Sequence, residues 1–333
     1  MWGLASHRVL ALIAALAWCP AHADADAGSW HAVGAMQVKR TDHGVGVLNG
    51  TLHALGGFAF NDQNPDASYL SSMEAYHPGS GKWTQCFAPS ASPPCESIAP
   101  MSVTRFNVGV GVLGGMLYAV GGQNGDKGDD SLKTVEKYDP AANSWTPVAP
   151  MTVVRNGPGV GVLGGLLYAV GGVSCSGCDA LDTVEAYNST TNTWAERSAM
   201  SVPRTALGVG VAGGLLYAVG GASDGIYLSS VEAYHPTTDS WTLVKPMSVP
   251  RVYLGVGVLG GLLFAVGGYD APFDDLASVE AYNPANNSWH AVAPMAVARY
   301  GPAVGVLEGT IYSTGGRNGD TYALGSVEAY QVR

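Results

Sequence analysis

The sequence is short of charge. Lys, Arg, Asp and Glu make up only 13% of its 333 residues, and acidic residues outnumber basic ones by 26 to 16, which gives a formal net charge of −10. Because phosphate backbones are recognised by clustered Lys and Arg, this balance argues against nucleic acid as a partner. No internal apolar stretch approaches the roughly 18 residues that span a bilayer, so we expect no membrane span.

The sequence also lacks the short motifs of familiar catalytic sites. It has no Gly-x-Ser-x-Gly turn, no His-Glu-x-x-His pair and no phosphate-binding loop. Its histidines occur at unrelated places and do not predict a metal site. The acid pairs Asp129-Asp130 and Asp274-Asp275 are candidate Ca²⁺ ligands, although such pairs in loops are usually only solvated. We therefore expect no cofactor, and binding rather than catalysis.

Glycine, by contrast, is abundant, with 46 residues, and much of it recurs in one unit that fills most of the chain. Each of six copies has a Gly pair followed by Glu-x-Tyr, and a Trp recurs with them. The Gly pairs begin at Gly56, Gly121, Gly171, Gly220, Gly267 and Gly315. The Glu residues are Glu74, Glu136, Glu185, Glu232, Glu280 and Glu328. The last four Trp residues lie 49, 47 and 48 residues apart, and such a period indicates a repeat protein.

One copy shows that the unit consists of strands. In the third copy, residues 158–163 predict a strand with Gly at alternate positions, and residues 166–170 a second, buried strand. Residues 183–187 predict a third strand, and a fourth opens at Thr193. Short apolar runs bounded by Gly are typical of strands, and four antiparallel strands make one propeller blade. The alternate glycines suit inner strands, where neighbouring backbones crowd together.

A unit of nearly 50 residues with a double Gly, Glu-x-Tyr and Trp resembles the kelch repeat over roughly residues 30 to 330. The resemblance implies an all-β fold, a six-bladed kelch β-propeller that forms a single domain over residues 24–333. Residues 30–33 read as a fourth strand, and the chain ends with the first three strands of a sixth copy, so we expect the N-terminal strand to close the last blade. Kelch adaptors of ubiquitin ligases carry BTB and BACK domains ahead of the propeller. Here the propeller starts almost at once, and we expect neither those domains nor a ligase role.

Residues 1–23 resemble a secretory signal peptide. His7-Arg8 precedes the apolar run of residues 9–18, and Ala21-His22-Ala23 fits a small-x-small cleavage site. A lipoprotein signal ending at Cys19 is the rival interpretation, but Trp18 stands where a small residue is expected; an uncleaved membrane anchor would need a longer run. We expect cleavage after Ala23, a secreted or periplasmic location, and a monomer.

Four cysteines remain after such cleavage, in two close pairs. An even number in an exported protein favours disulfides, so we expect Cys86 to pair with Cys95 and Cys175 with Cys178. A redox-active Cys-Ser-Gly-Cys pair and a four-cysteine zinc site are the alternatives. The first needs a helix N-terminus, and the second a shorter ligand spacing than Cys-x8-Cys.

Two sets of residues are candidates for ligand binding. The first is an arginine in each copy, four residues after a Met. Six such arginines predict a cationic ring near the channel mouth. The alternative is that each arginine pairs with the Glu of Glu-x-Tyr and holds the blade together. The second set comes from the loops between strands 2 and 3 and between strands 4 and 1, which differ among copies. The candidates assigned to this loop face are Arg105, Arg155, Arg204, Arg251, Arg299, Phe106, Asn156, Tyr253, Tyr300, Tyr227 and Phe60.

Exposed aromatic side chains beside polar ones suit a protein or glycan surface, so we expect an exported binding module whose ligand is an unknown protein or carbohydrate. The alternative is a sugar mutarotase or related isomerase. Resemblance to the exported kelch sialic acid mutarotase, which uses ordinary Arg and Glu residues, implies that possibility.

Overall fold

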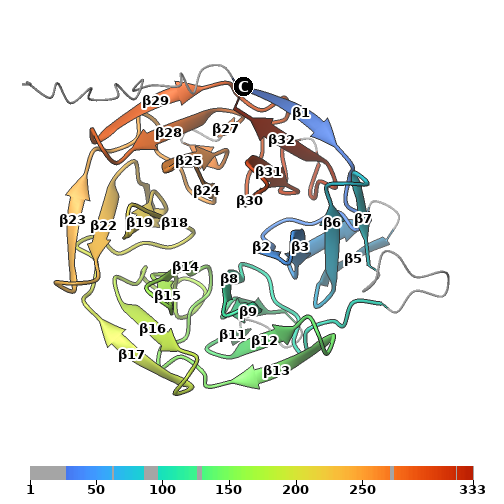
Figure 1. Cartoon of the computed structure of the whole chain (residues 1–333), viewed down its shortest axis with the longest axis horizontal. Coiled ribbons are helices and arrows are strands. Elements are labelled where there is room, and N and C mark those ends of the chain that lie inside the picture. Colours follow the sequence, from blue (N-terminus) through green and yellow to red (C-terminus); the bar gives the residue numbers. More distant parts are fainter. Residues whose placement is uncertain are drawn as a thin grey trace, which may run out of the picture.

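The structure is a computed structural model of the whole chain, and it describes residues 28–61, 64–85, 97–125, 130–270, 274–319 and 321–332. The described residues contain strands, turns and no helix. Six four-stranded antiparallel sheets stand as blades in a ring, with the first strand of each blade nearest the axis (Figure 1). The predicted six-bladed propeller is confirmed.

The blades follow the order of the chain, and the strands of each blade run in sequence from the axis to the outer rim. Blades 1 to 3 are β2 (Gly44–Leu48), β3 (Thr51–Leu55), β6 (Met73–His77), β7 (Lys82–Thr84); β8 (Gly109–Leu113), β9 (Met116–Val120), β12 (Val135–Asp139), β13 (Ser144–Val148); and β14 (Gly159–Leu163), β15 (Leu166–Val170), β16 (Val184–Asn188), β17 (Thr193–Arg197). Blades 4 to 6 are β18 (Gly208–Ala212), β19 (Leu215–Val219), β22 (Val231–His235), β23 (Ser240–Val244); β24 (Gly255–Leu259), β25 (Leu262–Val266), β28 (Val279–Asn283), β29 (Ser288–Val292); and β30 (Ala303–Leu307), β31 (Thr310–Thr314), β32 (Val327–Gln331), with the N-terminal strand β1 (Ser29–Val33) outermost.

Small hairpins project from four of the blades, between the second and third strands. They are β4 (Phe58–Asn61) with β5 (Asn64–Tyr69), β10 (Gln123–Asn124) with β11 (Asp130–Ser131), β20 (Ala222–Ser223) with β21 (Ile226–Tyr227), and β26 (Tyr269–Asp270) with β27 (Asp274–Asp275). We call the side of the disc that carries these hairpins and the entries to the first strands the loop face.

The N-terminal strand closes the ring as predicted. Strand β1 pairs antiparallel with β32 over five residues, from Ser29 with Gln331 to Val33 with Val327. The two strands lie side by side although they come from opposite ends of the chain (Figure 1). Trp30 packs on Tyr330 with ring centroids 5.3 Å apart, and its indole N–H donates to the carbonyl of Ala293 on the preceding blade at 2.9 Å. This closure removes an open sheet edge.

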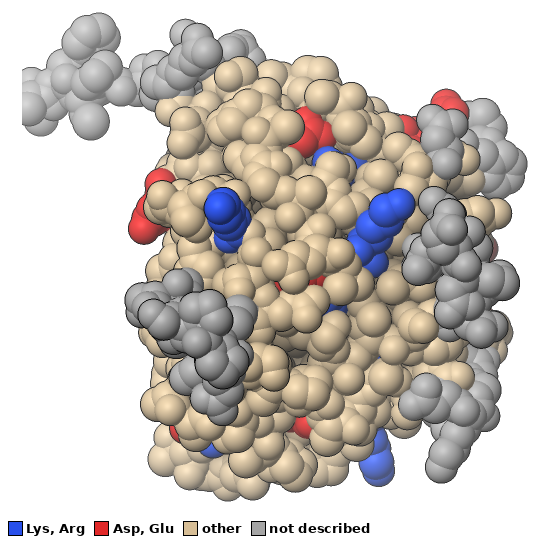
Figure 2. Space-filling view, turned by 90° about the vertical axis from the view of Figure 1, so that its right-hand side faces the viewer, with Lys and Arg blue, Asp and Glu red and all other residues tan. Residues whose placement is uncertain are grey.

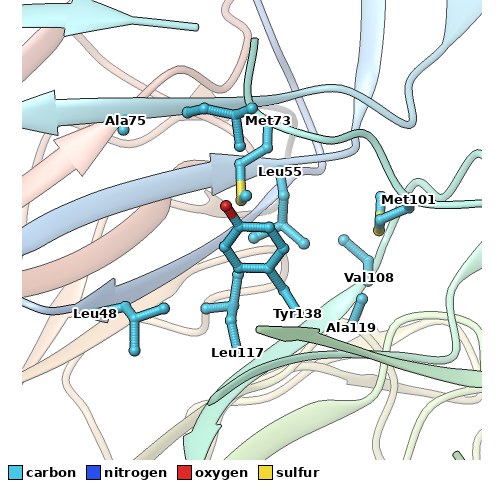
Figure 3. Packing of buried hydrophobic residues seen from close by; sticks show 10 residues of the cluster. Leu48, Leu55, Met73, Ala75, Met101, Val108, Leu117, Ala119 and Tyr138 are labelled. Carbon is cyan, nitrogen blue, oxygen red and sulfur yellow. The ribbon is translucent and has the colours of Figure 1, made fainter. Parts of the chain in front are cut away.

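The hydrophobic core lies between neighbouring blades. In the cluster of Figure 3, Leu55 and Met73 come from blade 1, whereas Leu117 and Tyr138 come from blade 2, and all four are buried. Met101, on the connection between the two blades, packs beside them. Because each blade buries both faces against its neighbours, no blade has a complete core alone.

Crowding at the axis explains the alternate glycines of the first strands. A Cβ atom added to Gly210 of β18 would lie 2.9 Å from Cγ1 of Val256 on β24, in the next blade. Gly221, in one of the double-Gly turns, has a φ of 91°, and its N–H donates to the carbonyl of Arg251 at 2.8 Å. Glycine is therefore required at these places for close approach and for left-handed backbone.

The outer surface reflects the low charge of the sequence. Figure 2 shows the side of the disc, where single Lys, Arg, Asp and Glu residues are scattered over a largely uncharged surface. Among the described residues, there is no helix long and apolar enough to cross a membrane.

Candidate functional site

The six repeated arginines lie inside the blades. All six side chains are fully buried, and each Nη2 lies 3.0 to 3.1 Å from a Glu Oε1 of the same blade. The pairs join Arg40, Arg105, Arg155, Arg204, Arg251 and Arg299 to Glu74, Glu136, Glu185, Glu232, Glu280 and Glu328 in that order.

Arg251 shows how these guanidinium groups are held, although Nε of Arg155, Arg204 and Arg299 is buried without a hydrogen-bond partner among the described residues. Nη1 of Arg251 donates to the carbonyls of Gly267 at 2.9 Å and Ser278 at 2.8 Å, and its Nη2 donates to the hydroxyl of Ser278 at 3.0 Å. Burial lowers the pKa of Arg251 and the Glu280 carboxylate opposes that shift, but an arginine stays charged at neutral pH. The contacts therefore support the blade-holding role, and the expectation of a cationic ring facing a ligand is corrected: the guanidinium groups have no access to solvent.

Main-chain segments from all six blades surround the channel mouth on the loop face. The residue two places after each arginine has a left-handed φ between 50° and 64°, and these residues are Asp42, Asn107, Gly157, Ala206, Tyr253 and Gly301. Backbone hydrogen bonds join four of the six successive pairs, for example Tyr253 N–H to Ala206 O at 2.9 Å and Gly301 N–H to Tyr253 O at 3.0 Å. The backbone thus fixes the positions from which the side chains of Asp42 and Tyr253 project.

A hollow lies on the loop face beside these segments. It has a volume of about 650 Å³ and opens between the loops of blades 4, 5 and 6. We call it the tyrosine hollow because its lining includes Tyr227, Tyr253, Tyr269, Tyr300 and Tyr322. The remaining lining residues are Thr205, Ala222, Val252, Asp275, Arg317, Asn318 and Gly319.

Four of the tyrosines form a continuous chain of ring contacts. Tyr253 and Tyr300 are stacked, with centroids 4.5 Å apart and planes 29° apart. Tyr269 meets Tyr300 edge-on at 5.5 Å, and Tyr227 meets Tyr269 edge-on at 5.8 Å. The guanidinium of Arg317 lies 4.0 Å from the ring centre of Tyr300, which is a cation–π contact. The rings hold one another in place, so the hollow is largely formed before a ligand arrives.

Pairing between loops brings Arg317 to this place. The N–H groups of Tyr300 and Arg317 each donate to the carbonyl of the other at 2.8 Å, and Val252 and Tyr269 exchange hydrogen bonds in the same way one blade earlier. The side chain of Arg317 is exposed, and within the described residues its guanidinium has no carboxylate at ion-pair distance.

Near the stacked rings, in the lining of the channel, lies the half-buried side chain of Asp42. The pKa of Asp42 is raised to about 6, because burial disfavours the charged form more than the Arg317 charge and the hydrogen bond from Thr41 favour it. The Thr41 hydroxyl donates to Oδ2 at 3.2 Å, whereas Oδ1 is buried without a hydrogen-bond partner among the residues that the structure describes. Burial also raises the pKa of Asp275, against the influence of the Gly319 backbone and Arg317.

The structure brings together three of the predicted site residues, Tyr227, Tyr253 and Tyr300. Phe106 lies elsewhere on the loop face, where its ring packs 5.0 Å from that of Tyr69. Asn156 is buried, and its amide donates to Oε1 of Gln123 at 2.8 Å. The side chain of Phe60 lies outside the described residues.

Sequence reasoning placed Arg317, Tyr322 and Asp275 in the variable loops of this face but did not single them out as residues that bind a protein or carbohydrate. The repeat does contain a pattern from which the position of Arg317 could have been predicted. The residue after each Gly pair bonds to the residue after the repeated arginine, so the two variable positions of one blade entry share a place on the loop face. Within the described ranges, no group of three His, Cys, Asp or Glu residues is arranged to hold a metal ion.

Cys175 and Cys178 form the predicted disulfide, with Cα atoms 5.2 Å apart. It closes the loop between β15 and β16, which leaves the sulfur atoms of this pair bonded to each other rather than available for zinc. The predicted Cys86–Cys95 pair lies outside the described residues.

Six blades, each with a buried Arg–Glu pair and a double-Gly turn, define a repeat propeller whose loops vary around one face. The chain belongs to the family of the Kelch motif, which matches residues 39–86, 104–152, 155–201, 203–248, 250–296 and 298–333. The solved structure of YjhT has the same fold, with a TM-score of 0.68 and 15% sequence identity over 89% of this chain and 95% of that one.

Curated relatives match only parts of the chain. Kelch-like ECH-associated protein 1B of Danio rerio is 38% identical over 99 residues, which are 29% of this chain and 14% of that protein. Kelch-like protein 13 of Homo sapiens is 42% identical over 55 residues, or 16% of this chain and 8% of that protein. The similarity to both therefore concerns the repeats, and spans a small share of the relatives' length.

Proposed function

We propose that this protein is a binding module that recognises another protein through its loop face, with the tyrosine hollow as the anchoring site. The observation that carries the proposal is the chain of tyrosine rings with Arg317 in a hollow of about 650 Å³. Tyr and Arg are the residues that most often dominate protein–protein binding energy, especially where they line a preformed depression.

Exposed apolar side chains beside the hollow favour a polypeptide partner. Ile226 and Tyr322 are each 66% exposed, and both are next to or within its lining. Large apolar groups kept in water at the edge of a pocket are typical of surfaces that a partner covers. The name of the relative Kelch-like ECH-associated protein 1B also describes association with a partner.

A carbohydrate is the second candidate ligand. The tyrosine faces can stack on sugar rings, and Asp275 and Asn318 supply hydrogen-bonding groups in the same hollow. The mutarotase alternative is not favoured, because the six Arg–Glu pairs are buried and cannot reach a sugar on the loop face.

The test exposes immobilised protein to a displayed library of random linear peptides and to an array of oligosaccharides. We expect the wild-type protein to select peptides, and Tyr300→Ala to weaken binding of a selected peptide at least about tenfold, the loss of a central anchor. Leu243→Ala is the matched control, since Leu243 is 62% exposed on β23, outside the hollow. Melting curves establish that each variant is folded.

Three results would separate the candidates. Equal binding by wild-type and folded Tyr300→Ala protein contradicts the assignment of the hollow. Binding to oligosaccharides alone supports the carbohydrate candidate. A loss shared by Leu243→Ala points to β23 instead.

We also propose that the protein is exported after removal of residues 1–23. N-terminal sequencing of the mature protein is expected to begin at Asp24, and non-reducing peptide mapping to recover Cys86 joined to Cys95. A mature chain that retains Met1, or a free thiol at Cys86, contradicts this proposal.

A further inference from the structure

A second hollow adjoins the tyrosine hollow on the loop face. It has a volume of about 270 Å³ and lies between the disulfide-closed loop of blade 3 and the β20–β21 hairpin of blade 4. We call it the disulfide hollow, because Cys178 is part of its wall. Thr205 and Ala222 line both hollows, and their backbones are joined by hydrogen bonds of 2.9 Å in each direction. The two depressions therefore share one wall.

The β20–β21 hairpin forms a ridge between them. Gly225 lines the disulfide hollow, Tyr227 lines the tyrosine hollow, and Ile226 between them is 66% exposed. The turn residues Asp224 and Gly225 have φ values of 48° and 77°, as a tight two-residue hairpin turn requires, so the ridge has a defined shape. A partner that covers Ile226 meets both hollows at once.

The two hollows differ in chemistry. The tyrosine hollow offers ring faces and the cation of Arg317, whereas the disulfide hollow has two exposed carboxylates in its lining, Asp179 and Asp224. Within the described part of the chain neither carboxylate has an ion pair. Asp179 directly follows the disulfide-bonded Cys178, and Asp224 stands in the turn of the ridge on the other side of the hollow.

We propose that the disulfide hollow is a second subsite, which takes a Lys or Arg side chain of the same polypeptide that anchors in the tyrosine hollow. This inference rests on the proposed function and adds the chemistry of the partner: a segment that crosses Ile226, with a basic residue on the Asp224 side. Charge complementarity selects the basic residue, and the shared wall places it within a few residues of the anchor.

The experiment uses the peptides selected by the wild-type protein from the random library. We expect Lys or Arg to be enriched at one fixed spacing from the anchoring residue. A synthetic peptide of this kind is then titrated by calorimetry against wild-type protein and against the double variant Asp179→Asn, Asp224→Asn. The affinity is expected to fall about fivefold, because two partly exposed ion pairs contribute modestly, and the difference should vanish at high salt.

The matched control removes the same charge elsewhere. Glu196→Gln with Glu308→Gln changes two exposed carboxylates outside both hollows, and it is expected to leave the affinity unchanged. Unchanged affinity in the Asp179, Asp224 variant, with loss in Tyr300→Ala, would overturn the second subsite and leave the tyrosine hollow standing. Unchanged affinity in both would overturn the proposed function as well. An equal loss in the control variant would show only long-range charge attraction and would also overturn the subsite.

Discussion

At the scale of single residues, the buried arginines and glutamates of the repeat are tolerated because each Arg is paired with a Glu of the same blade. Removing one partner of such a pair leaves the other charge in a site without water, which costs far more than the pair itself contributes. In blade 4, Glu232 accepts from Arg204 at 3.1 Å with one oxygen, and from the backbone and hydroxyl of Ser201 at 2.8 and 2.6 Å with the other. One carboxylate thus joins its own blade to the connection entering it.

We therefore predict that Glu232→Ala lowers the free energy of unfolding by about 3 to 5 kcal/mol, the usual cost of an uncompensated buried charge. Urea unfolding measures it. Glu196→Ala, an exposed change on β17, is the control and is expected to stay within about 0.5 kcal/mol of wild type. A small effect of Glu232→Ala would mean that Arg204 finds water or another acceptor.

Asp42 is expected to make the protein less stable as the pH rises. Its pKa is raised from 3.8 to about 6 in the folded protein, so the folded state holds a proton that the unfolded state has released between these values. The contribution of Asp42 to stability therefore falls as the pH rises from about 4 to about 6 and then levels off. Arg317 limits this loss, since its charge favours the ionised carboxylate.

The variant Asp42→Asn lacks that titration. Its stability relative to wild type is expected to rise between pH 4 and pH 6 and to remain constant above, as measured by urea unfolding across this range. A constant difference at every pH would show that Asp42 titrates normally.

At the scale of elements, the inner strands depend on close contact between neighbouring blades. We predict that Gly210→Ala destabilises the protein by about 1 to 3 kcal/mol, the range for overpacking, because the new methyl group would lie 2.9 Å from Val256 and 3.1 Å from Leu263. Gly79→Ala is the control, since that turn has open space around the added atom. Chemical denaturation compares the two, and equal stabilities would show that β18 and β24 can move apart.

The strands were predictable because each is a short local pattern repeated six times. The expected strand at residues 166–170 coincides with β15, and the one expected at residues 158–163 begins one residue later, at Gly159. The role of the arginines was less predictable, since a motif containing Arg and Glu does not reveal whether the guanidinium faces the channel or the blade.

The tyrosine hollow was predictable only in part, for a physical reason. Tyr300 follows its arginine directly, whereas Tyr253 stands two places after its own, on left-handed backbone. Their stacking accompanies a backbone hydrogen bond between the two blade entries, from Gly301 N–H to Tyr253 O, and Arg317 joins them through pairing between two loops. No single repeat contains this information, because the hollow exists only where three different blades meet.

At the scale of the whole molecule, six blades enclose an axis only if the ring is closed. Strand β1 does this from the N-terminal end. Strand β1 pairs with β32 over five residues. The segment after β1 also bonds to the last blade, because Met36 N–H donates to Gly325 O at 2.8 Å. It also donates from Gln37 N–H to Glu74 of blade 1 at 2.7 Å, so it binds the last blade to the first.

Deletion of residues 30–36 is therefore predicted to damage the whole propeller, although the segment is near the end of the chain. The loss removes Trp30 from Tyr330 and leaves the backbone groups of β32 unpaired at an open edge, which invites pairing between molecules. We expect a melting temperature lower by several degrees and dimers or larger species in size-exclusion chromatography. A chain shortened only by residues 1–27 is the control and is expected to match the full-length protein. If the deletion variant melts like this control and elutes with it, the ring does not depend on β1, and the remaining three strands of blade 6 are sufficient to hold blades 5 and 1 together.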